Sequence, residues 1–142
     1  RAQHFPAAVV QRAAVVVLAT GSTLRAVRAA TQAMAELREP EACPGMLVSL
    51  VIGPGEPYGE REISEALGVP SVGSLPRDPR AAAVLSDGAP AGRLFAQSPM
   101  LRAARTVATR LVESAAEHES RLTPPLAPVP APATTVGGGR VR

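Results

Sequence analysis

The stretch "MLVSLVIGPGEPYGEREISEALGVPSVGSL", residues 46–75, decides the fold. Its first seven residues are apolar except for Ser49, which is typical of a strand buried on both faces of a parallel sheet. A glycine- and proline-rich turn leads into a short helix that packs Ile63, Ala66 and Leu67 and stops at Gly68. "SVGSL", residues 71–75, predicts the next strand. The segment therefore predicts a β-α-β unit of a parallel sheet.

The upstream segment repeats this pattern. "AAVVVLA", residues 13–19, predicts another buried strand, and residues 20–23 turn the chain. A helix that ends at Pro40 follows, and apolar side chains recur along it at helical spacing. We expect its buried face to hold Leu24, Val27, Thr31, Met34 and Leu37.

The downstream segment "SPMLRAARTVATRLVESAAEHES", residues 98–120, predicts the longest helix. Ser98 is a favourable N-cap, and Pro99 suits the first helical position. The helix carries a wide apolar stripe, made of Leu101, Ala104, Ala108, Leu111 and Ala115 together with Met100, Val107 and Val112. With the two upstream units, this helix completes a predicted α/β fold: a partial parallel sheet of about three strands with flanking helices.

Composition is consistent with a single domain. The chain has 142 residues, of which 46% are hydrophobic, and this is enough for one core. We expect the partial α/β domain to cover residues 1–120. Residues 121–142 are rich in Pro, Thr and Gly and predict a disordered tail. Because the chain begins at Arg1 without a methionine, we expect a fragment that is open at its N-terminal end.

The charge and the cysteine content limit the expected location and partners of the protein. All 15 basic residues are arginine, and the net charge is +3. Cys43 is the sole cysteine, so an intrachain disulfide is impossible and a cytoplasmic location is expected. No apolar run approaches the roughly 20 residues that span a bilayer, and the start lacks the features of a signal peptide. We therefore expect no membrane partner.

Parallel sheets place ligand sites at the carboxyl ends of their strands, which here are residues 20–23, 53–59 and 76–79. The third of these loops contains Asp78, and only one other aspartate, Asp87, occurs in the chain. Asp78 precedes Pro79 and predicts the N-cap of a short helix that Gly88 ends. Because that helix would separate the two aspartates, a catalytic carboxylate pair is not expected.

Other residues that could take part in binding or catalysis also have ordinary structural interpretations. The "GPGEPYG" segment, residues 53–59, forms either an ordinary turn or a close backbone approach to a ligand. Tyr58 either stacks on a base or packs at the edge of the core. His4 and His118 lack the companions that a metal site or a catalytic relay needs, so surface or helix-end positions are expected. Cys43 has no neighbouring base and is expected to be inert.

Residues 47–90, and above all "ALGVP" (66–70) followed by "VGSLPRDP" (72–79), resemble the C-terminal half of ParA/MinD-type ATPases. The likeness extends over roughly residues 8–115, since "VVVLATGSTLRAVRAATQAM" is similar to an upstream strand and helix of that family. The resemblance implies a P-loop NTPase-like fold, ATP as ligand and Mg as cofactor. It also implies a role in chromosome partitioning or in positioning cellular machinery.

The resemblance also implies which residues approach the nucleotide. Gly53 stands where the family often has a base-contacting asparagine, so that side-chain contact is absent. Pro76, Arg77 and Asp78 match the family's P-x-D/E loop, which lies against the adenine partly through backbone groups. The chain contains no lysine, so it cannot supply the Walker lysine. We therefore expect no catalysis, and no tight binding of ATP or Mg, by this chain alone.

Three functional hypotheses follow. The first is the base-side half of a ParA/MinD-like ATPase domain, with the upstream half of the domain or a homodimer partner completing it. The second is a non-catalytic interaction module of the same fold, and the third is an unrelated small α/β ligand-binding domain. Arg102, Arg105 and Arg110 lie off the apolar stripe and either form a solvated face or contact DNA phosphates non-specifically.

Overall fold

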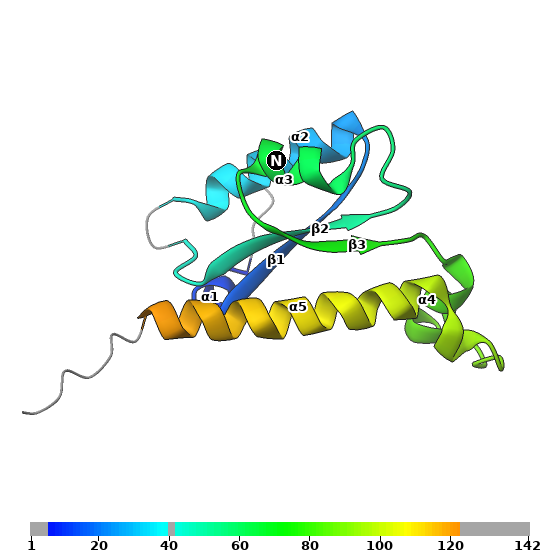
Figure 1. The fold of residues 1–142 in the computed structure, drawn as a ribbon. Coiled ribbons are helices and arrows are strands. Elements are labelled where there is room, and N and C mark those ends of the chain that lie inside the picture. The colour runs from blue at the N-terminus through cyan, green and yellow to red at the C-terminus, as the bar shows by residue number, and fades with distance from the viewer. Residues whose placement is uncertain (1–5, 40–41, 123–142) are drawn as a thin grey trace, which may run out of the picture.

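The computed structural model describes residues 6–39 and 42–122. It is an α/β structure, as predicted, with three strands and flanking helices (Figure 1). The elements are, in order, α1 (Ala7–Val10), β1 (Val15–Gly21), α2 (Leu24–Leu37), β2 (Met46–Ile52), α3 (Glu60–Leu67), β3 (Ser71–Leu75), α4 (Pro79–Ser86), the 3₁₀ helix η1 (Phe95–Gln97) and α5 (Pro99–Leu122).

The sheet is parallel and has the strand order β1-β2-β3. The pairing of β1 with β2 is regular from Val15 opposite Met46 to Gly21 opposite Ile52. The bounds of β2 and β3 agree with the prediction, whereas β1 begins and ends two residues later than predicted. Strands that follow one another in the sequence are thus neighbours in the sheet, and helices connect them. Successive β-α-β units produce this arrangement.

Helices α2 and α3 cover one face of the sheet, and α5 lies on the other (Figure 1). We call the first face the α2–α3 face and the second the α5 face. Strand β2 contributes to both, because Val51 and Val48 point to opposite sides. The core of the α2–α3 face consists of Ala30, Met34, Val51, Ile63, Leu67 and Val69. The buried core of the α5 face consists of Val48, Val72 and Val107.

The prediction for α2 was wrong about part of its buried face and about where the helix ends. Leu24 is 53% exposed and Thr31 is exposed, whereas Ala30 and Ala33 are buried beside Met34 and Leu37. The line of contact with α3 and the sheet determines which side of a helix is buried, and small alanines let the helix approach closely. The helix also ends at Leu37 rather than at Pro40.

Arg38 joins the ends of two helices. Its Nη2 donates to the carbonyl oxygens of Leu67 at 2.7 Å and Gly68 at 2.8 Å. Gly68 has a φ of 63° and ends α3, as predicted. The arginine therefore satisfies carbonyl groups at the end of α3 that have no partner within the helix. Within α3, Ile63 and Leu67 are buried as predicted, but Ala66 is exposed.

Two glycines mark places where chain segments approach closely. A Cβ at Gly45 would collide with the backbone carbonyl of Ala13 and lie 2.9 Å from the Ala14 oxygen. Gly73 of β3 has a φ of 133°, and a Cβ there would lie 3.1 Å from Val107 Cγ2 of α5. Gly45 therefore permits backbone contact before β1 and β2, and Gly73 lets α5 rest directly on β3.

Only part of the predicted stripe on α5 is buried. Val107 is 7% exposed, and Leu111 packs against the core of the α5 face. Ala108 and Val112 are exposed, Val112 at 70%, so the prediction was wrong for them. The reason is that α5 contacts the sheet mainly at β3, through the side of the helix that carries Val107 and Leu111. The helix continues to Leu122, two residues into the predicted tail, and residues 123–142 lie outside the described residues.

Candidate functional site

Hydrogen bonds hold the loops after β1 and β2 and the end of β3 together at the carboxyl edge of the sheet. The buried Ser22 Oγ donates to the Glu56 carbonyl at 2.7 Å, and the Tyr58 N–H donates to the Ser22 carbonyl at 3.3 Å. The Gly53 N–H donates to the Leu75 carbonyl at 2.9 Å. The loop after β2 is therefore joined both to the loop after β1 and to the end of β3.

Two of the predicted nucleotide-binding residues come together at this edge. Gly53 lies against the last residue of β3, and Pro76 directly follows that residue. Gly53 has a φ of 119°, a conformation that residues with side chains rarely adopt. Arg77 is exposed, and its neighbour Asp78 turns away into α4. The edge thus presents backbone at Gly53 and a half-buried ring at Pro76.

Asp78 is the N-cap of α4, as predicted. Its Oδ1 accepts a hydrogen bond from the Ala81 N–H at 3.0 Å, and Pro79 is the first helical residue. The helix ends at Ser86, and Gly88 follows with a φ of 67°. Asp87 lies at the far end of α4, where its Oδ1 accepts from Ser86 Oγ at 2.8 Å. Each aspartate therefore has a local structural role.

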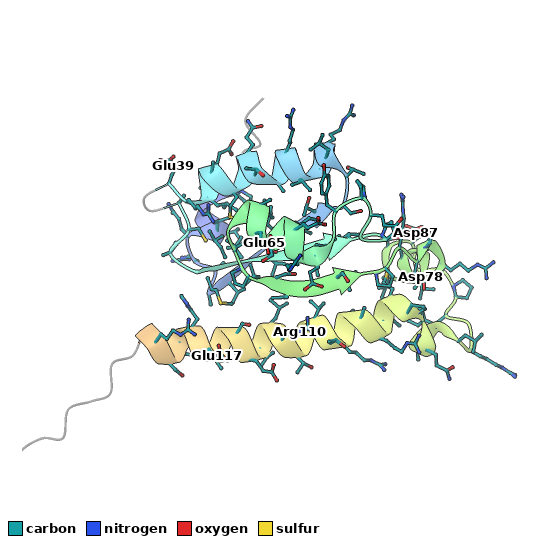
Figure 2. The ribbon with its side chains drawn as sticks, turned by 45° about the horizontal axis from the view of Figure 1, so that its top comes forward. Glu39, Glu65, Asp78, Asp87, Arg110 and Glu117 are labelled. Atoms are coloured by element: carbon teal, nitrogen blue, oxygen red, sulfur yellow. The ribbon has the colours of Figure 1, made fainter. Side chains whose placement is uncertain are left out.

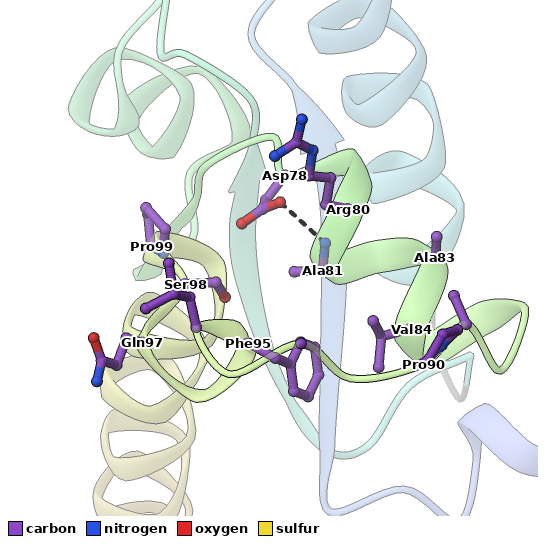
Figure 3. Close-up of a pocket in the computed structure, with 13 residues that line it drawn as sticks. Asp78, Arg80, Ala81, Ala83, Val84, Pro90, Phe95, Gln97, Ser98 and Pro99 are labelled. Atoms are coloured by element: carbon purple, nitrogen blue, oxygen red, sulfur yellow. Dashed lines mark hydrogen bonds between the residues drawn. The ribbon is translucent and has the colours of Figure 1, made fainter.

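A cavity of about 800 Å³ lies between α4, the chain that follows it and the start of α5 (Figure 3). Its wall is largely apolar and includes Ala81, Val84 and Phe95, and Asp78 and Ser98 add polar atoms. This volume is in the range of small-molecule sites. Of the predicted nucleotide-binding residues, only Asp78 lines the cavity.

Sequence reasoning missed this cavity because its walls are separate segments that only the fold brings together. One signal was available, since Phe95 is one of two phenylalanines in the whole chain and stands just before the predicted cap Ser98. The cap itself is confirmed, because Ser98 Oγ accepts from the Leu101 N–H at 3.2 Å. The side chain of Phe95 is directed toward α4 (Figure 3).

The three arginines predicted to contact DNA are all exposed on α5. Arg105 and Arg110 lie five positions apart, which separates them by about 140° around the helix. Arg110 is on the side toward β3, where its Nη1 lies 3.5 Å from the position of a Cβ on Gly73. Figure 2 shows Arg110 on α5 and Glu65 on α3, on opposite sides of the sheet. Only Arg102 and Arg105 thus point fully away from the sheet.

The remaining candidates have mostly structural surroundings. Tyr58 packs against the core of the α2–α3 face. Cys43 Sγ donates to the Gly45 carbonyl at 3.7 Å. His118 is half-buried near the C-terminal end of α5, a helix-end position being one of the two expected, and its Nε2 has no hydrogen-bond partner within the described residues. His4 lies outside the described residues.

Metal-binding clusters and membrane-spanning helices are both absent from the part of the chain that the structure describes. Within residues 6–39 and 42–122, no three histidine, cysteine, aspartate or glutamate side chains gather where they could hold a metal ion. No helix in these same segments has the length and apolar character needed to cross a membrane. Comparison of the chain with known protein families, curated proteins and solved structures finds no match.

Proposed function

We propose that this chain is the base-side half of an ATP-binding α/β domain of the ParA/MinD type, from a cytoplasmic protein that partitions DNA or positions cellular machinery. The observation that carries the proposal is the carboxyl edge of the parallel sheet. There the loops after β1 and β2 are joined, and Gly53 lies beside the end of β3. Parallel α/β sheets bind their ligands at this edge.

The edge residues fit the base of a nucleotide better than its phosphates. Gly53 offers backbone groups, and Pro76 offers a small, half-buried apolar ring. The chain has no lysine for the phosphates, and its described residues contain no cluster of carboxylates that would hold Mg. No step of phosphoryl transfer is therefore assigned to this chain. Any turnover requires groups supplied by another polypeptide segment.

The test compares this chain with a longer one that includes the coding sequence upstream of Arg1. We expect a G-K-G-G-x-G-K-[ST]-like stretch in that sequence, and we expect the longer chain to bind ATP in preference to GTP. The 142-residue chain alone should show no ATP hydrolysis above a buffer blank. Turnover by the rigorously purified short chain, or a longer chain that does not bind ATP, would contradict the proposal.

A second candidate function is that of a small α/β ligand-binding domain, which the cavity beside Phe95 favours. Titration with adenosine, followed by the amide chemical shifts of the chain, separates the two functions. Shifts confined to Gly53 and Leu75 support binding of a base at the carboxyl edge. Shifts confined to Ala83 and Phe95 support a ligand in the cavity instead.

Non-specific DNA contact through α5 remains part of the first proposal. Each phosphate contact releases counterions, so the affinity should fall steeply with salt. Replacing Arg102 and Arg105 with alanine should flatten this dependence, whereas Arg110→Ala should change it less because that side chain lies toward β3. DNA binding that persists at high salt or depends on sequence would argue against phosphate contacts alone.

A further inference from the structure

Two unlike charges line the cavity between α4 and the start of α5 without pairing with each other. Asp78 precedes α4, and Arg80 is the second residue of that helix. Their side chains form no ion pair with each other or with any other described residue. Only Oδ1 of the carboxylate has a hydrogen-bond partner within the described residues, the Ala81 N–H. Both charges are therefore available to a ligand.

The wall of the cavity beside these charges is apolar. Ala81 is 3% exposed, and Val84 and Phe95 are half-buried. Figure 3 shows the ring of Phe95 directed toward α4, so the ring and the aliphatic side chains border a common space. An aromatic or branched apolar group packs well against such a wall, since rings and methyl groups gain most from leaving water. The cavity therefore combines an apolar wall with two opposite charges at the N-terminal end of α4.

Ser98 adds a hydroxyl group to the cavity from the start of α5. Its Oγ accepts a hydrogen bond from the Leu101 N–H at 3.2 Å, and its own proton has no acceptor among the described residues. A serine hydroxyl has two lone pairs and one proton, so Ser98 can still accept a second hydrogen bond or donate one. Asp78 and Ser98 thus provide polar atoms from the two helices that border the cavity (Figure 3).

The charges around the cavity decide which class of ligand fits. Residues 76–110, which include every residue that lines the cavity, contain six arginines and only two acidic residues. This excess of positive charge disfavours a ligand that carries only a positive charge. A ligand that carries only a negative charge meets the carboxylate of Asp78. A molecule with one charge of each sign avoids both penalties, because its ammonium group approaches Asp78 and its carboxylate approaches Arg80.

We infer that this cavity binds a free α-amino acid with a large apolar side chain, such as phenylalanine. The ammonium and carboxylate groups of an α-amino acid are attached to the same carbon, and Asp78 and Arg80 stand close together at the same end of α4. The ammonium group donates to Asp78 Oδ2 and Ser98 Oγ, and the carboxylate accepts from Arg80. The apolar side chain packs against Val84 and Phe95. The volume of about 800 Å³ accommodates this ligand.

This inference rests on the second candidate function, because it names the ligand class of the same cavity, and it does not depend on ATP binding. Three probes are titrated into the 142-residue chain, and amide chemical shifts report their binding. They are phenylalanine, phenethylamine, which lacks the carboxylate, and hydrocinnamate, which lacks the ammonium group. We expect phenylalanine to shift the Ala83 and Phe95 amides. It should bind more tightly than either analogue by about tenfold or more, since each analogue loses a hydrogen bond between charged groups.

Variants that remove one charge each assign the two ends of the ligand. Asp78→Asn keeps the helix cap, because asparagine caps as well as aspartate, but removes the negative charge. It should weaken phenylalanine binding by about tenfold and leave phenylalanine no tighter than hydrocinnamate. Arg80→Gln should weaken binding by a similar factor and leave phenylalanine no tighter than phenethylamine. Asp87→Asn and Arg93→Gln are the matched controls, since both residues are exposed and neither lines the cavity.

The outcomes separate the ligand class from the cavity itself. Phenylalanine that binds no more tightly than one of its analogues, or equal losses from the charge variants and their controls, would overturn the inference. If adenosine shifts the Ala83 and Phe95 amides and phenylalanine does not, the amino-acid ligand is refuted and the second candidate function stands. If no probe shifts these amides, both are refuted. Circular dichroism of each free variant verifies that a loss of affinity does not come from unfolding of α4.

Discussion

The two faces of the sheet differ in how completely they are covered. On the α2–α3 face, Met34, Ile63 and Leu67 are almost inaccessible to solvent, and two helices lie side by side over the strands. On the α5 face a single helix rests on β3, and Val17 of β1 remains open. The difference shows that burial stabilises the α2–α3 face more than the α5 face.

Apolar residues also have different effects on the two faces of the sheet. Apolar residues on the α2–α3 face stabilise the chain by burial, at roughly 25 cal/mol for each Å² removed from water. Val112 and Ala108 are equally apolar but contribute little to the stability of the isolated chain, because they remain in water. Where exposed apolar surface is contiguous, it more often marks an interaction site than it adds to stability.

The largest expected effect comes from core truncation. Ile63→Ala should lower the free energy of unfolding by about 2–5 kcal/mol, since Ile63 is fully buried. Val107→Ala on the α5 face should cost roughly 1.5 kcal/mol, at about 0.8 kcal/mol for each methyl-sized group. Val112→Ala is the control and should change stability by less than about 0.5 kcal/mol. Urea unfolding measures all three, and equal losses for Ile63→Ala and Val112→Ala would contradict the difference between the faces.

A second substitution tests how α5 is seated. Gly73→Ala should destabilise the chain by about 1–3 kcal/mol, because alanine rarely adopts a φ of 133° and its Cβ would press on Val107. Gly92→Ala is a matched control, since no atom lies within 4 Å of its added Cβ. Thermal unfolding of the two variants provides the comparison. If they melted alike, α5 would not rest on β3 as closely as the structure shows.

The third substitution concerns α4, which belongs to neither face. Asp78→Ala should cost about 0.5–2 kcal/mol through loss of the cap, and Asp78→Asn should restore most of that loss. Asp87→Ala serves as the control, because Asp87 bonds only locally at an exposed position. The longer chain that includes the upstream half should retain its preference for ATP over GTP after Asp78→Ala. Unchanged melting together with a lost preference would show that the Asp78 side chain contacts the base directly.

The smallest expected effect concerns the junction between α2 and α3. Arg38→Ala should lower the free energy of unfolding by about 1 kcal/mol, since the hydrogen bonds to Leu67 and Gly68 lie partly in solvent. Arg28→Ala, an exposed arginine on the same helix, should be nearly neutral. Calorimetric melting of both variants distinguishes a structural arginine from a solvated one. Equal melting temperatures would mean that Arg38 does not hold the α3 end in solution.

Local chemistry made much of the fold predictable. Short apolar-rich segments between turn residues located β2 and β3. The caps Asp78, Ser98 and Gly68 follow from interactions within a few residues of each helix end. The buried side of α2 was not predictable, because it depends on where α3 and the sheet meet the helix. The exposed half of the stripe on α5 was missed for a related reason. A sequence pattern reports which residues are apolar and does not report how wide a surface covers them.

The candidate site likewise has some features that could be predicted from the sequence and others that could not. The position of the loops at the carboxyl edge follows from the strand order, and the cap role of Asp78 follows from its neighbours. The hydrogen bond between Ser22 and Glu56 spans 34 positions, and no local pattern indicates it. The cavity beside Phe95 likewise depends on how α4 and the start of α5 come together.

The contact at Gly45 has a consequence for how sequences of this kind can diverge. The obstacle there is the main chain of Ala13 and Ala14, which every residue type possesses, so no compensating side-chain replacement at those positions makes room for a Cβ at position 45. Most core positions tolerate paired changes of size, but this one does not. In a related sequence, any residue other than glycine at this position would show that the starts of β1 and β2 have moved apart. Glycine at position 45 is thus a reference point for aligning distant relatives when side-chain similarity has been lost.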